Sequence, residues 1–145
     1  MNGMTPIVKK VTQLIVGLIF LYGIYIITHG HLTPGGGFAG GAVVAGSFIL
    51  LVLAYGSDIL KLKKREEGSS VVESLGIFLF IVLAFAAIFI GTKVFFANYL
   101  PKGVIGELIS AGVIPLYNIA VGIEVAAALF TIFLALVIYK EEVLK

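Results

Sequence analysis

The chain has 145 residues, of which 60% are hydrophobic and 12% are charged, and its formal net charge at pH 7 is +2. So few polar side chains cannot cover a soluble globule of this size, and the composition therefore indicates an integral membrane protein. The absence of cysteine excludes disulfides, thiolate zinc sites, iron–sulfur ligation and a cysteine nucleophile. Any redox centre must therefore belong to another chain.

The first apolar run covers about residues 11–28 and approaches the length of about 20 residues that a spanning helix needs. Lys9 and Lys10 precede it, as basic residues precede the core of a signal peptide. The run is longer than the usual signal core of about 7 to 15 residues, and no small-x-small cleavage site follows it. We therefore expect a retained transmembrane helix.

A glycine-rich segment, HGHLTPGGGFAGG, follows this run and leads into a second apolar run over residues 38–59. Proline cannot continue a helix and biases the residue before it away from helical geometry, so the first helix must end before this segment. Small residues that recur every four positions allow two membrane helices to approach closely. We expect a tight turn and close helix packing, formed by Thr33, Pro34, Gly35, Gly36, Gly37, Phe38, Gly40 and Gly41.

Two other interpretations of this segment are weaker. Glycines at a helix start can bind an anion, but no strand precedes them and no phosphate-loop motif is present. His29 and His31 suggest a metal site, but side chains two residues apart in an extended segment point to opposite sides. We expect no metal site on this chain.

A charged connection over residues 61–70 precedes a third apolar run, residues 72–97. The basic part of this connection favours anionic lipid headgroups. Because Glu66 and Glu67 interrupt so short a basic patch, we expect no nucleic-acid partner.

Lys93 is predicted near the outer end of the third helix, where its stem can carry the ammonium to the membrane interface. Alternatively, Lys93 forms an ion pair with Glu124 or with Glu107. Glu107 lies in the connection between the third and fourth runs, where we expect it to be solvated or interfacial, with a re-entrant segment as the alternative.

The last apolar run, residues 115–139, contains Glu124 at about 13 Å along the helix, near the middle of a hydrocarbon core about 30 Å thick. An ionised carboxylate at that depth costs at least a few kcal/mol, so the group protonates, pairs with a cation or lines water. Three roles stay open: ion or proton movement, a salt bridge to a neighbouring subunit, and a buried protonated bystander. Asn118 and Gly122 lie on another face of this helix and predict assembly contacts.

Orientation follows from the lysines and arginines, which concentrate on the cytoplasmic side of membrane proteins. Lys93 and Lys102 fall on one side, and the other eight of the ten fall on the opposite side: Lys9, Lys10, Lys61, Lys63, Lys64, Arg65, Lys140 and Lys145. The sequence therefore predicts an all-α integral membrane fold with four transmembrane helices in one domain over residues 1–145. Both termini are expected to be cytoplasmic, and the glycine-rich hairpin is expected on the outer side.

The segment HGHLTPGGGFAGGAVVAG and the later PLYNIAVGIEVAA resemble the MrpB (MnhB) family of Mrp-type sodium/proton antiporters. This resemblance extends over nearly the whole chain. It implies a small subunit of a hetero-oligomeric antiporter in a prokaryotic cytoplasmic membrane, with other antiporter subunits as partners, Na+ and H+ as transported ions and no cofactor on this chain. Similar subunits also occur in the archaeal membrane-bound hydrogenase and sulfane sulfur reductase complexes, which implies a respiratory redox complex as the second setting.

The residues themselves show no catalytic array or metal-spaced cluster, so we expect no covalent chemistry on this chain. Three functional classes remain. The first is a subunit of a cation- and proton-translocating assembly, the second is a purely structural subunit of such an assembly, and the third is an independent homo-oligomeric channel.

Overall fold

The computed structural model describes residues 3–56, 62–90 and 93–143. This part of the chain forms four long α-helices: α1 (Pro6–His29), α2 (Gly37–Tyr55), α4 (Leu62–Phe89) and α5 (Ile114–Val143). All four are long and apolar enough to cross a membrane, which confirms the predicted all-helical membrane class.

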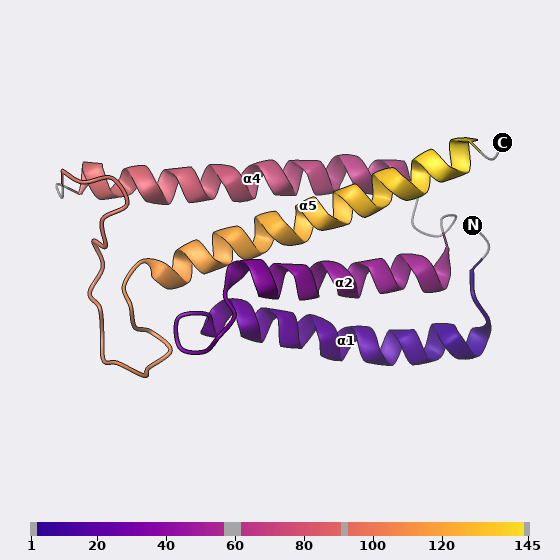
Figure 1. Cartoon of the computed structure of the whole chain (residues 1–145), viewed down its shortest axis with the longest axis horizontal. Coiled ribbons are helices and arrows are strands. Elements are labelled where there is room, and N and C mark those ends of the chain that lie inside the picture. Colours follow the sequence, from indigo (N-terminus) through magenta and orange to yellow (C-terminus); the bar gives the residue numbers. More distant parts are fainter. Residues whose placement is uncertain (1–2, 57–61, 91–92, 144–145) are drawn as a thin grey trace.

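Helix α5 is the centre of the bundle (Figure 1). It contacts α4 on one side and the α1–α2 pair on the other, and α1 and α2 also pack against each other. Within the described residues α4 contacts no helix except α5. Successive helices run in opposite directions, so that α1 begins and α5 ends at the same end of the bundle (Figure 1).

Helix α1 begins five residues earlier than the apolar run indicated. The Thr5 hydroxyl accepts a hydrogen bond from the Val8 amide at 3.4 Å, and Pro6 occupies the first turn, where its missing N–H is not needed. The Met4 amide donates to the Ala54 carbonyl at 2.9 Å. The Thr5 cap and this contact support a helix that begins before the apolar run. An apolar run reflects the part of a helix that lies in the membrane, and it does not mark the residue at which the helix begins.

The connection between α1 and α2 needs glycine at two positions. Gly35 and Gly36 have φ values of 151° and 107°, a region that L residues rarely adopt, and α2 begins at the next residue. Helix α2 ends before the predicted end at residue 59. Gly56, with φ 81°, terminates the helix, and its amide donates to the Val52 carbonyl at 2.9 Å. The last three residues of the expected range, 57–59, lie outside the described residues.

The third predicted helix was shifted along the chain. Helix α4 takes in the charged residues from Leu62 onward, because lysine, arginine and glutamate are good helix formers even though they are polar. It ends at Phe89, and not near residue 97. Lys93 and Phe96 have φ values of 55° and 61°, which a right-handed helix cannot contain, so the placement of Lys93 in a helix was wrong.

The connection between α4 and α5 is irregular and is fastened by Asn98. Its side-chain amide donates to the Ala111 carbonyl at 3.0 Å, and its side-chain oxygen accepts from the Val113 amide at 3.0 Å. These two bonds hold the connection directly before α5, which begins at Ile114 and continues beyond the expected end at residue 139 to Val143.

Small residues allow the central helices to approach each other. A Cβ atom added at Gly41 of α2 would lie 2.7 Å from the Gly122 carbonyl oxygen of α5. One added at Gly40 would lie 2.8 Å from the Gly23 carbonyl oxygen of α1. Helix α2 therefore meets its two neighbours through two glycine faces, backbone against backbone.

Candidate functional site

Glu124 lies where α5 crosses α4. A Cβ atom added at Gly76 of α4 would lie 2.7 Å from Glu124 Cβ and 2.9 Å from Glu124 Cα. Ten residues separate Glu124 from the start of α5 at Ile114, a rise of about 15 Å at about 1.5 Å per residue. The carboxylate therefore originates about 15 Å along α5, where this helix approaches α4 closely.

A small cavity of about 200 Å³ adjoins this crossing. Its other walls are apolar or glycine, and it is lined by Gly76, Ile77, Phe80, Ala120, Val121 and Glu124. The Glu124 side chain is half-buried and makes no hydrogen bond or ion pair with the described residues. The cavity is large enough for a few water molecules, so the carboxylate has room for a small ligand.

Glu73 is a second acidic residue at this interface, and it is not among the site residues predicted from the sequence. Ser69 of α4 donates to the Ala127 carbonyl of α5 at 3.0 Å, and Gly76 contacts Glu124. Glu73 stands between these two contacts at helical spacings of four and three residues, so it lies on the α4 face that meets α5. The prediction that the helix begins at residue 72 had placed it at the membrane edge.

Lys93 and Glu107 are not brought to this site. Both are exposed residues of the connection between α4 and α5. The Glu107 backbone amide donates to the Val104 carbonyl at 3.2 Å, and its carbonyl accepts from the Ser110 hydroxyl at 2.6 Å. Within the described residues neither side chain forms an ion pair with Glu124, so the three ion-path candidates do not form one cluster.

Asn118 and Gly122 lie against the glycine-rich connection and the two helices it joins. Gly30 and Gly37 are so close to Asn118 that a Cβ atom on either would collide with it, and Gly122 lies against the Ile27 side chain of α1. The Asn118 Nδ2 atom is buried without a hydrogen-bond partner in the described part of the chain, as are both ring nitrogens of His31. Among the described residues Asn118 thus fills space at the turn without a side-chain hydrogen bond from its Nδ2 atom to another helix, and its predicted role in assembly stays a prediction.

Comparison with known proteins decides the family. Residues 7–131 match the domain model described as related to the MnhB subunit of Na+/H+ antiporter. The chain belongs to the MnhB family. With four helices able to span a bilayer, it is a multi-pass membrane protein.

Three relatives show how far this similarity extends. The MnhB-family chain is 39% identical to an uncharacterized protein of Methanocaldococcus jannaschii over 88% of its own length and 50% of that protein. It is 27% identical to a Staphylococcus aureus (strain Newman) protein named as antiporter subunit mnhB2, over 90% of this chain and 92% of that one. A chain of the membrane-bound sulfane sulfur reductase, an archaeal respiratory membrane complex, superposes with a TM-score of 0.72 and 32% identity, over 88% of this chain and 56% of that one. The chain thus spans about half the length of two of these relatives.

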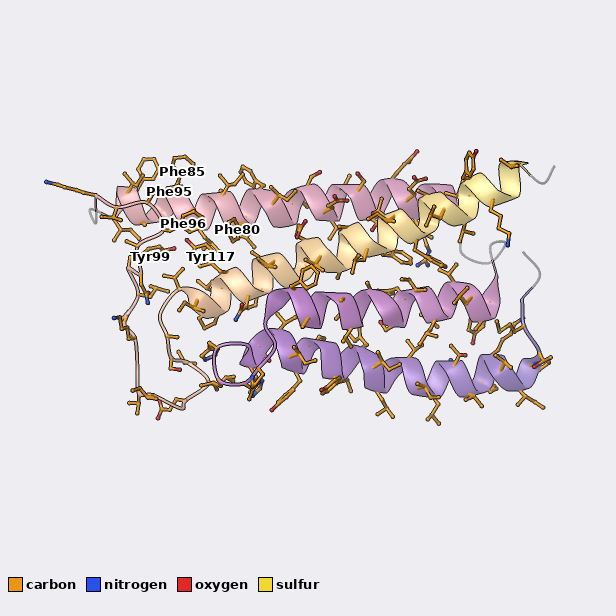
Figure 2. The ribbon with its side chains drawn as sticks, viewed as in Figure 1. Phe80, Phe85, Phe95, Phe96, Tyr99 and Tyr117 are labelled. Carbon is orange, nitrogen blue, oxygen red and sulfur yellow. The ribbon has the colours of Figure 1, made fainter. Side chains whose placement is uncertain are left out.

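An aromatic cluster at one end of the MnhB-family bundle was also missed. The ring centroids of Phe80 and Tyr117 are 5.2 Å apart, and Phe96 lies 5.5 Å from Phe80 and 5.6 Å from Tyr117. Figure 2 shows these rings gathered where α4 ends and α5 begins. Phe80 also lines the Glu124 cavity, so one ring of the cluster forms part of the cavity wall.

Proposed function

We propose that this chain is a non-catalytic membrane subunit of a multi-subunit complex that translocates ions in the manner of Mrp-type Na+/H+ antiporters. The observation that carries the proposal is Glu124, which is half-buried, has no ion pair among the described residues and lies beside a cavity at the crossing of α4 and α5. A carboxylate at that depth is stabilised by a proton or a cation. Na+ and H+ are therefore the proposed transported ions, with no cofactor on this chain.

Family membership supports a role as one subunit among several. The names of two relatives place them in an antiporter and in a respiratory membrane complex. The four helices that the structure describes show no paired broken segments of the kind that form ion sites in stand-alone transporters. We therefore propose other Mrp-type antiporter subunits as partners, with hydrogenase or sulfur-reductase subunits joining them if the host is a redox complex.

The proposed orientation places both termini in the cytoplasm and the connection between α1 and α2 on the outer side of a prokaryotic cell membrane. The concentration of basic residues at one end supports this orientation, since α1 begins and α5 ends there (Figure 1). We also propose that residues 1–145 form one membrane domain.

Glu73 extends the proposed role of Glu124. Glu73 and Glu124 lie on facing helices, and Glu73 is about one helical turn along α4 from Gly76, which contacts Glu124. The two carboxylates provide two positions between which a proton or cation can move. Lys93 and Glu107 lie on an exposed connection and are outside this path.

The test is Na+-dependent proton movement in vesicles containing the complete complex. Glu124→Gln removes the charge and keeps the shape, and Glu107→Gln makes the same charge change on the exposed connection. We expect Glu124→Gln to reduce exchange to near background and Glu107→Gln to leave it unchanged, with equal amounts of assembled complex. Unchanged exchange in Glu124→Gln complexes would support a purely structural subunit. Ion flux through the purified chain alone would support the homo-oligomeric channel.

A further inference from the structure

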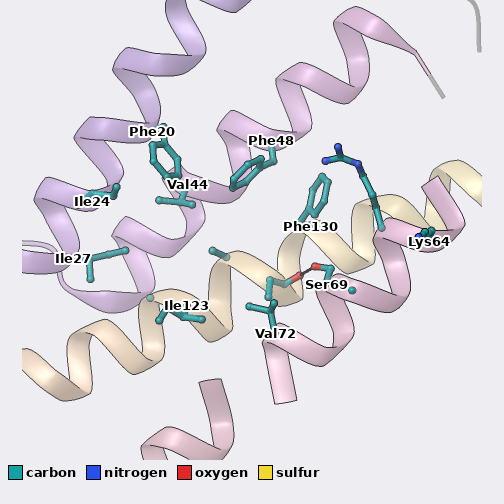
Figure 3. A pocket seen from close by; sticks show the side chains of 15 residues that line it. Phe20, Ile24, Ile27, Val44, Phe48, Lys64, Ser69, Val72, Ile123 and Phe130 are labelled. Atoms are coloured by element: carbon teal, nitrogen blue, oxygen red, sulfur yellow. Dashed lines mark hydrogen bonds between the residues drawn. The ribbon is translucent and has the colours of Figure 1, made fainter. Parts of the chain in front are cut away.

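A long open groove lies between α4 and the α1–α2 pair, with α5 as its floor. It exists because α4 contacts α5 and, within the described residues, neither α1 nor α2. Its volume is about 810 Å³. In the close view, Phe20 and Phe48 lie on one side, Val72 and Lys64 on the other, and Ile123 and Phe130 between them (Figure 3).

The groove has one charged end and is otherwise almost entirely apolar. Lys64 and Arg65 line it where α4 begins, and both side chains are exposed. Neither forms an ion pair with a carboxylate in the part of the chain that the structure describes. Two cations without an ion pair among the described residues, beside an apolar groove, favour a ligand with an anionic head and a hydrocarbon tail.

The helical spacing of α4 turns the cations toward the groove and the neighbouring acids away from it. Lys64, Gly68 and Val72 follow one another at four-residue intervals, and all three line the groove together with Arg65. Glu66 and Glu67 fall between these positions and do not line it. The run KKREE is therefore nearly neutral in sum but cationic on the side that faces the groove.

The length of the groove matches one leaflet of a bilayer. It follows α5 from Gly122 to Phe130, a rise of about 12 Å, whereas half of the hydrocarbon core is about 15 Å. A transmembrane helix of a partner would need a surface about twice as long. Basic residues between transmembrane helices also recognise anionic headgroups.

From these observations we propose that the groove binds one anionic membrane lipid. Lys64 and Arg65 hold its phosphate, and its hydrocarbon chains lie against Phe48, Phe130 and Ile123. The lipid fills the space between α4 and the α1–α2 pair and so fixes α4, whose only helix contact in the described chain is α5.

The first test is native mass spectrometry of the full chain in detergent with added phosphatidylglycerol or phosphatidylcholine. We expect wild type to retain one phosphatidylglycerol in preference to phosphatidylcholine, and the Lys64→Gln, Arg65→Gln double variant to retain the two equally. The control Lys10→Gln, Lys140→Gln removes two exposed cations from the same end of the bundle and should keep the preference. Equal retention by wild type, or equal loss in the control, would overturn the proposal.

A steric pair tests the hydrocarbon part of the site. Val72→Trp fills the groove and should lower retention of both lipids, whereas Val71→Trp, at an exposed position that does not line the groove, should not. Equal loss of lipid in these two variants would count against the groove as the binding site.

The assembled complex distinguishes a lipid from a partner helix. Because this chain contains no cysteine, Val72→Cys gives it a single position for a benzophenone label, and adducts of this chain can be identified in the isolated complex. We expect illumination to give an adduct with the mass of a membrane lipid. A covalent adduct with another polypeptide would show that a protein fills the groove, and the lipid proposal would be wrong.

Discussion

Gly76 of α4 lies directly against Glu124 of α5, with the backbone of one residue touching the Cα and Cβ of the other. A larger residue at position 76 would separate the two helices at the level of the carboxylate. Glycine here therefore determines how tightly α4 closes the cavity beside Glu124. The proposed ion site thus depends on a residue that carries no functional group.

Gly76→Ala tests this relationship. The added methyl group meets backbone and Cβ atoms that cannot rotate away, so we expect a loss of about 1–3 kcal/mol in stability and a lower thermal unfolding midpoint in detergent. Gly17→Ala is the matched control, because no neighbouring atom lies within 4 Å of its added Cβ. The close approach would be disproved by equal midpoints for the two variants.

Gly41→Ala should separate α2 from α5 in the same way, since its added Cβ would lie 2.7 Å from the Gly122 carbonyl oxygen. Gly46→Ala in the same helix meets open space, and replacing a helical glycine by alanine there should raise stability by up to about 1 kcal/mol. Thermal unfolding of the two variants should therefore shift in opposite directions. A shift in the same direction for both would contradict the glycine-face packing.

Glu73 and Glu124 should act together if they form one path. We expect Glu73→Gln and Glu124→Gln each to reduce Na+-dependent proton exchange, and the double variant to be no slower than the slower single one. The corresponding coupling energy should fall within the range of about 0.5–3 kcal/mol that is typical of neighbouring residues.

Glu67→Gln is the matched control for that cycle, because Glu67 is an exposed residue of the same helix. It should leave exchange unchanged. Independent, multiplicative losses from Glu73→Gln and Glu124→Gln would show that the two carboxylates work separately.

Asn98→Ala should release the connection between α4 and α5. It removes two side-chain hydrogen bonds and leaves the Val113 amide without its partner, at a cost of about 1–3 kcal/mol. Limited proteolysis should then cut residues 93–113 faster than in wild type. Asn98→Asp keeps the acceptor for Val113 but not the donor to Ala111, so its cleavage rate should be intermediate. No change in rate for Asn98→Ala would mean that other contacts hold this connection.

Four spanning helices could be predicted from the sequence, because the length and composition of an apolar run reflect the thickness of a bilayer. Helix ends could not be, because they depend on local chemistry. Thr5 caps α1 before the first apolar run begins, Gly56 ends α2 before the second run ends, and the charged residues of α4 extend that helix beyond its apolar run. Helix α4 ends at Phe89, and Lys93, which the third apolar run includes, has a positive φ.

The candidate site could be predicted only in part. A single carboxylate deep in an apolar run is visible in sequence, which is how Glu124 was found. The position of Glu73 at the interface depends on the register between α4 and α5. Ser69 and Gly76 fix this register through contacts with residues far along the chain. The groove depends on how the helices pack: among the described residues α4 contacts neither α1 nor α2, which the periodicity of the sequence does not reveal.

The composition of the native assembly tests the central claim most directly. We would tag the chain after Lys145, purify it from its own membrane in mild detergent and identify every co-purifying polypeptide by mass spectrometry. We expect large antiporter-type subunits in constant ratio to this chain, either alone or together with hydrogenase or sulfur-reductase subunits. Recovery of the chain by itself, or only as a homo-oligomer, would contradict its role as a subunit of an Mrp-type ion-translocating complex.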